Sequence, residues 1–152
     1  MKTKKFFALP VAVLVALVAV IGICGCSKTA NGKFSVTNGE FEVNDTFLVA
    51  RLNCDSADAD WSYAIDGKGD IQMESDELTE GKAADGSVVE GVVASHAFRF
   101  SGTGASEQTI TFTYGGDSGK TVTCKVVTND KGSVQSVNVT DSEGAAGSLT
   151  AK

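Results

Sequence analysis

Apolar and polar residues alternate with a period of two along much of the chain after residue 33. In residues 46–54, the even positions from Leu48 to Cys54 fall on one face, and Arg51 lies on the other. This alternation is typical of strands that bury one face only. Turn dipeptides such as Asn38-Gly39 separate several of these stretches and favour tight hairpins.

The same pattern predicts strands in nine places along the chain. They lie around 34–36, 41–43, 46–54, 61–65, 71–73, 96–100, 109–114, 121–127 and 133–140. Residues 74–87 are polar and acidic and are interpreted as a long loop with a possible short strand or helical turn, and residues 88–93 as a possible edge element. With about seven to nine short strands and no convincing amphipathic helix, the chain is expected to form an all-β antiparallel sandwich.

The first 26 residues follow a different pattern. Three lysines head the chain, a charge-free apolar run covers residues 6–23, and Gly25 precedes Cys26. These are the parts of a secretory signal peptide. The ending resembles the bacterial lipobox, which implies that residues 1–25 are removed and that Cys26 becomes the first residue and carries lipid. The alternative is an uncleaved transmembrane anchor, since about 18 apolar residues can span a bilayer.

Either interpretation places the rest of the chain outside the cytoplasm, attached to the cell membrane. We expect residues 26–33 to be the lipidated Cys and a tether, residues 34–140 the sandwich, and residues 141–152 a flexible C-terminal tail. The 127 residues from Cys26 onward are enough for one domain with a core of its own.

The net charge limits the kinds of partner that the chain can bind. Without the three lysines of the leader, the chain has 10 basic and 19 acidic side chains, so its net charge is −9. Nucleic acid attracts basic surfaces, so it is excluded as a partner. An anionic membrane would repel the domain as well, so the lipid on Cys26 must provide the anchoring.

Two cysteines remain after the leader, Cys54 and Cys124. Their strand phase points both thiols inward, and an extracytoplasmic compartment is oxidising. We therefore expect a disulfide between the sheets, worth roughly 4 kcal/mol on the loop-entropy model; two free buried thiols are the alternative. Trp61 opens an alternating strand, so it is expected in the core rather than as an exposed binding residue.

Four segments resemble, in their order and spacing, the chagasin-like family of inhibitors of papain-type cysteine proteases. They are strand 47–53 with its following loop and Trp61, the glycine-led stretch 91–100, strand 109–114 and the closing strand 121–128. The resemblance spans roughly residues 34 to 128. It implies an immunoglobulin-like sandwich whose three loops at one end wedge into a protease cleft.

The resemblance also implies which residues contact a partner. They are Asp55, Ser56, Ala57 and Asp58 in the first loop, Gly91, Val93 and Ala94 in the second, and Gly116, Asp117 and Ser118 in the third. The family has the motifs Asn-Pro-Thr-Thr-Gly, Gly-x-Gly-Gly and Arg-Pro-Trp at these places. Here small and acidic residues replace most of them, so the loops keep the spacing with degenerate motifs.

No group of residues indicates catalysis, so we expect a protein that is not an enzyme and needs no cofactor. His96 shares its strand phase with Phe98 and Phe100, and no Ser or Cys nucleophile with a partnering Asp can be placed beside it. A partly buried ring held by a hydrogen bond is therefore expected.

Acidic residues gather shortly after the third predicted strand. They are Asp55, Asp58, Asp60, Asp66 and Asp70. Carboxylate oxygens are ligands that Ca²⁺ prefers, but the spacing lacks the glycine and the distal bidentate Glu of a helix-loop-helix site. A solvated acidic loop without metal is the preferred interpretation, and a Ca²⁺ site is the alternative.

Three functions remain open. The leading hypothesis is a surface lipoprotein that binds a protein partner through its end loops, in the manner of a chagasin-like inhibitor of a papain-type cysteine protease. The second is a cell-envelope interaction or structural module that keeps the fold without inhibition. The third is a Ca²⁺- or solute-binding lipoprotein.

Overall fold

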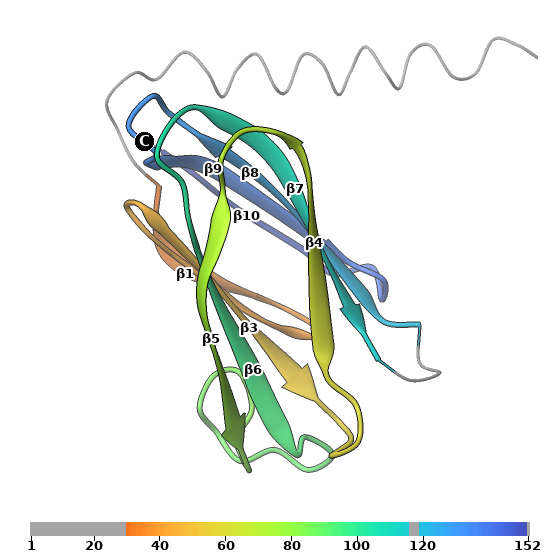
Figure 1. Cartoon of the computed structure of the whole chain (residues 1–152). Coiled ribbons are helices and arrows are strands. Elements are labelled where there is room, and N and C mark those ends of the chain that lie inside the picture. The colour runs from red at the N-terminus through yellow and green to blue at the C-terminus, as the bar shows by residue number, and fades with distance from the viewer. Residues whose placement is uncertain (1–29, 116–118, 152) are drawn as a thin grey trace, which may run out of the picture.

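The computed structural model describes residues 30–115 and 119–151, which form two packed antiparallel sheets (Figure 1). The strands are β1 (Asn31–Val36), β2 (Gly39–Asn44), β3 (Phe47–Cys54), β4 (Trp61–Lys68), β5 (Gln72–Glu80), β6 (Ala94–Ser101), β7 (Ser106–Tyr114), β8 (Thr121–Thr128), β9 (Val134–Asp141) and β10 (Ala146–Thr150). One sheet has the order β1-β2-β3-β6-β5 and the other β10-β9-β8-β7-β4. The expected all-β, antiparallel, immunoglobulin-like sandwich is confirmed.

The core lies between the inner faces of the two sheets. Along β3 the burial alternates residue by residue, so Leu48, Leu52 and Cys54 are buried as their phase predicted. The ring of Phe112 on β7 lies at the centre, within 6.3 Å of the ring of Phe41 and nearer to two rings of β6. Aromatic pairs at such distances stabilise a core beyond the burial of their area.

The chain has more strand than its pattern predicted. β1 begins at Asn31, with Ala30 already buried, so the last residues of the expected tether belong to the sandwich. The strand expected around residues 71–73 continues to residue 80 as the nine-residue strand β5, through part of the expected loop. Residues 146–150 form β10 instead of a flexible tail. Residues 88–93, interpreted as a possible edge element, lie in a loop.

The disulfide expected between Cys54 and Cys124 is not formed, because both residues are free thiols. The two thiols do point inward, but at different levels of the sandwich. Cys54 ends β3 near Tyr114, whereas Cys124 pairs with Ile110, four residues before Tyr114 on β7. At ~3.4 Å per residue this is about 14 Å along the strands, which is more than a disulfide can span.

The two long sides of the sandwich differ. On one side β1 packs against β10, where Gly147 lies so close to the Phe34 ring that a Cβ would be 2.2 Å from it. On the other side β4 and β5 are the edges of different sheets, and each is paired with one neighbour only. Tyr63 of β4 reaches across this side and contacts the rings of Phe98 and Phe100.

The predicted signal peptide and Cys26, the expected lipidation site, lie outside the described residues. Within residues 30–115 and 119–151, no helix offers the length and apolarity that crossing a bilayer requires.

Candidate functional site

Three chain segments that the sequence marked as binding loops meet at one end of the sandwich. The amide of Val93 donates to the carbonyl of Cys54 at 2.8 Å, which joins the second loop to the first. The amide of Gly115 donates to the carbonyl of Asp60, also at 2.8 Å, which joins the third. We call this end, formed by residues 54–60, 81–94, 114–115 and 119–120, the loop end. Gly116, Asp117 and Ser118 lie outside the described residues.

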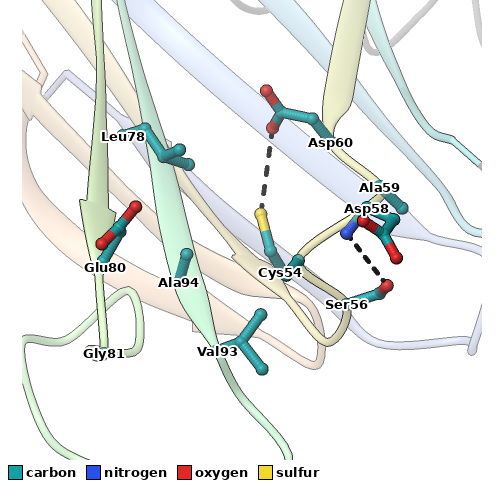
Figure 2. Close-up of a pocket in the computed structure, with 11 residues that line it drawn as sticks. Cys54, Ser56, Asp58, Ala59, Asp60, Leu78, Glu80, Gly81, Val93 and Ala94 are labelled. Carbon is teal, nitrogen blue, oxygen red and sulfur yellow. Dashed lines mark hydrogen bonds between the residues drawn. The ribbon is translucent and has the colours of Figure 1, made fainter.

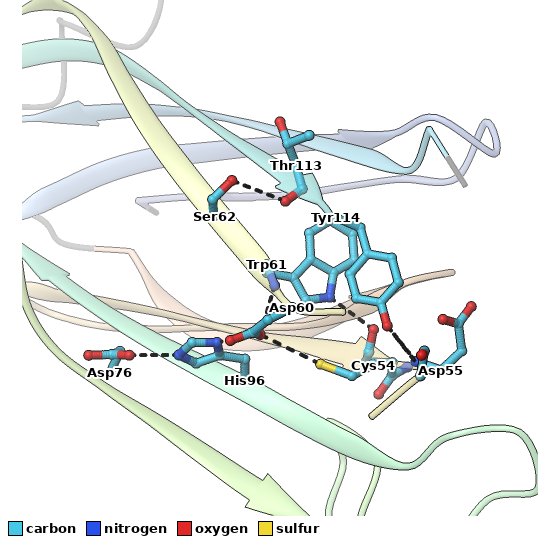
Figure 3. Close-up of polar contacts among 11 residues, drawn as sticks. Cys54, Asp55, Asp60, Trp61, Ser62, Asp76, His96, Thr113 and Tyr114 are labelled. Carbon is cyan, nitrogen blue, oxygen red and sulfur yellow. Dashed lines mark hydrogen bonds and ion pairs between the residues drawn. The ribbon is translucent and has the colours of Figure 1, made fainter. Parts of the chain in front are cut away.

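Tyr114 holds the first loop in place (Figure 3). Its hydroxyl oxygen accepts hydrogen bonds from the amides of Asp55 and Ser56, at 3.0 and 3.1 Å. Its ring packs on Trp61 with the ring centroids 5.0 Å apart. Trp61 itself is 4 % exposed and donates through Nε1 to the carbonyl of Asn53, so it is a core residue as expected.

An ion pair joins the first loop to the start of β8. Lys120 Nζ lies 2.5 Å from Asp55 Oδ2. The hydrogen bond from Lys120 lowers the pKa of Asp55, and the same bond raises the pKa of Lys120. Both shifts favour the charged forms, so the pair stabilises the loop at neutral pH.

His96 lies between two carboxylates (Figure 3). Its Nδ1 is 2.7 Å from Asp60 Oδ1, and its Nε2 is 2.7 Å from Asp76 Oδ2. Both ring nitrogens therefore lie within hydrogen-bond distance of a carboxylate oxygen. The expected partly buried, hydrogen-bonded ring is confirmed. It connects the residue before β4 in one sheet with β5 in the other.

Asp60 links His96 to a thiol. Both ring nitrogens of His96 are engaged by carboxylates, and Cys54 Sγ lies 3.9 Å from Asp60 Oδ1, the oxygen that also contacts His96. Burial raises the pKa of Cys54 to about 11, with the Asp60 carboxylate adding to the effect. A thiol in this state is a poor nucleophile at neutral pH.

The aspartates that the sequence grouped together are directed to different partners. Asp55 pairs with Lys120, Asp60 with His96, and Asp70 accepts hydrogen bonds from Thr103 and Ser106. Among residues 30–115 and 119–151, no three His, Cys, Asp or Glu side chains are placed to hold a metal ion.

A pocket of about 680 Å³ opens at the loop end, between the first loop and the ends of β5 and β6 (Figure 2). Its lining consists of Cys54, Ser56, Ala57, Asp58, Ala59, Asp60, Leu78, Glu80, Gly81, Val93 and Ala94. In Figure 2, Leu78, Glu80 and Val93 lie on one side of Cys54, and the first loop lies on the other. Leu78 is 51 % exposed and Val93 40 % exposed.

The pocket contains both expected and unexpected residues. Ser56, Ala57, Asp58, Val93 and Ala94 were expected as contact residues, and all five line it. Asp55 lies beside the lining residues, in the ion pair with Lys120, and Gly91 is exposed in the loop before β6. Leu78 and Glu80 were missed because residues 74–87 were interpreted as a loop. Asp76, Leu78 and Glu80 share one face of β5, but only Leu78 is apolar, so the sequence pattern did not indicate a strand here.

Comparisons of this chain with family models, curated proteins and solved structures return no match. The likeness to chagasin-like inhibitors therefore stays a resemblance in the order of sequence landmarks. The candidate site has to be interpreted from its own geometry.

Proposed function

We propose that this chain is a lipid-anchored cell-envelope protein that binds a partner protein through its loop end. The observation that supports the proposal most directly is the meeting of the loops beside a pocket with exposed apolar side chains. Leu78, Val88, Val89 and Val93 are all at least 40 % exposed at this end. Apolar side chains that gather at one place on a surface mark interaction sites more often than scattered ones do.

The position of the chain start agrees with this proposal. Asn31 pairs with Asn44 at the end of the first sheet that is opposite to the Cys54–Ala94 pair. Ala30 follows Cys26 by four positions, a span of at most about 14 Å. A lipid on Cys26 would hold the Ala30 end close to the membrane, so the loop end would face away from it and be open to partners.

The shape of the loop end favours a binding module over a strict protease inhibitor. A wedge that enters a protease cleft needs a protruding edge, whereas the described part of this end has a pocket between the first loop and β5. The residues replacing the family motifs are small or acidic and supply no aromatic anchor. Inhibition of a papain-type protease is the specific form of partner binding that can be tested first.

Two measurements test the proposal. Titration of the protein against papain measures inhibition, and no inhibition at micromolar protein would refute the inhibitory form. Partner binding is tested in the native host with a photocrosslinking residue at Val88, which is 84 % exposed. The matched control is Thr123, exposed on the outer face of β8. We expect a protein adduct from position 88 only; equal adducts or none from both positions would refute binding through the loop end.

The anchor is tested separately. Cys26→Ser should move the protein from the membrane fraction into the soluble fraction, because the acidic domain loses the lipid proposed to hold it there. A variant that stays with the membrane would show that the N-terminal segment itself is retained there.

A further inference from the structure

The inner face of β5 is uncovered at the loop end. Leu78 pairs with His96 and Glu80 with Ala94 across the β5–β6 ladder, so both side chains share the inward face of the sheet. In a closed sandwich such positions pack against the opposite sheet. Here β5 and β4 are the edge strands of the two sheets and do not pair with each other. Leu78 is left 51 % exposed. An apolar position of the inner face is thus left for another molecule.

The walls around this position are acidic. The pocket contains the carboxylates of Asp58, Asp60 and Glu80 and no Lys, Arg or His. Asp60 is engaged by His96, but neither Asp58 nor Glu80 has a carboxylate ion pair or hydrogen bond with another described residue. The free carboxylates and the apolar side chains lie in the same pocket, so a complementary ligand needs a positive group next to an apolar one.

The loop that follows β5 carries two more exposed apolar side chains. Val88 and Val89 are 84 % and 45 % exposed. An extended peptide has apolar side chains that suit such positions, whereas a small cation has none. The outer edge of β5 also presents backbone groups without a strand partner, and such edges accept an added strand.

We propose that this pocket binds an extended basic segment of a partner protein. An apolar side chain of that segment lies on Leu78 and Val93, and an adjacent Lys or Arg pairs with Glu80 and Asp58. The inference rests on the proposed function and specifies the chemistry of the partner. The acidic side chains along the β5 edge also discourage pairing between two copies of the chain, while they attract a basic segment.

The test measures peptide binding by calorimetry with the full chain in phosphatidylcholine nanodiscs. Three acetylated and amidated probes share one frame: Leu-Arg-Val-Lys, Leu-Gln-Val-Gln and Leu-Glu-Val-Glu. We expect the basic peptide to bind about tenfold more tightly than the neutral one, through two charge pairs. Empty nanodiscs should bind none of the three, because their lipid has no net charge.

Variants assign the binding to the pocket. Glu80→Gln should weaken binding of the basic peptide about fivefold, and Leu78→Ser by a similar factor through lost apolar contact. Glu77→Gln is the matched control, because it removes the same charge from the same strand on the outer face, opposite Ala97. It should leave the affinity unchanged.

Each other outcome is decisive. Equal binding of the three peptides, or equal losses in Glu77→Gln and Glu80→Gln, would overturn the proposed charge recognition. No binding of any peptide up to about 1 mM, together with specific crosslinks from position 88 in cells, would overturn this inference and leave partner binding in place. Peptide binding without such crosslinks would support the pocket chemistry and refute the proposed function.

Discussion

Replacing Tyr114 by Phe removes the one oxygen that accepts from two amides of the first loop. The amides of Asp55 and Ser56 lose their acceptor, while the ring keeps its contact with Trp61. A hydrogen bond of this kind contributes about 1 kcal/mol net, so the variant should lose about 2 kcal/mol of unfolding free energy. For a domain of this length the melting temperature should fall by about 8 °C.

The assay combines thermal unfolding, followed by circular dichroism, with amide hydrogen exchange. Exchange should accelerate at Asp55 and Ser56 and stay unchanged in the centre of β8. Tyr63→Phe is the control, since the Tyr63 ring contacts Phe98 and Phe100 but its hydroxyl has no hydrogen bond to a described residue. A Tyr114→Phe melting temperature within about 1 °C of the parent, with unchanged exchange, would show that the loop is held by other contacts.

Three further outcomes are expected. Cys54 and Cys124 should resist iodoacetamide in the native protein at pH 8, because burial raises the pKa of both thiols. Both should be labelled in urea without any reductant, and a disulfide-linked pair of peptides would contradict the free thiols. The lowered pKa of Asp55 gives stability that is present above pH 3.8, its ordinary pKa, and is lost as the pH falls below that value. Lys120→Gln should therefore flatten the acid side of a stability–pH profile, and an unchanged profile would contradict the ion pair. Gly147→Ala should cost about 1–3 kcal/mol by forcing β10 away from β1, measured by urea unfolding, whereas a silent substitution would show that β10 does not pack there.

Strand phase predicted the faces of the sandwich well, because one face of most strands is covered. The inward positions of β3 and β8, such as Leu52 and Val122, are buried where the alternation placed them. The phase shows which face of a strand a residue is on, but not its level along the strand. The prediction that both thiols point inward was therefore correct, while the predicted pairing of Cys54 with Cys124 was wrong. Their difference in level depends on register, which is set by contacts between distant strands.

The strands that were missed are those without a covered apolar face. β5 carries Asp76 and Glu80 on its inner face, because that face opens into the pocket and onto His96. β10 is short and packs only through Gly147 and Leu149, so its sequence resembles a tail. The partners of His96 could not be predicted, since they depend on how β5 aligns with β6 and on where the loop before β4 ends.

The direction of β1 determines how this protein would respond to mechanical force. The strand starts at Asn31 and runs toward the loop end, paired with β2 over six residues. If a partner is held at the loop end while the chain start is held at a membrane, the pull acts along the strand axis. The β1–β2 hydrogen bonds are then loaded together in shear instead of being opened one at a time, so the sandwich would resist extension at its attachment point.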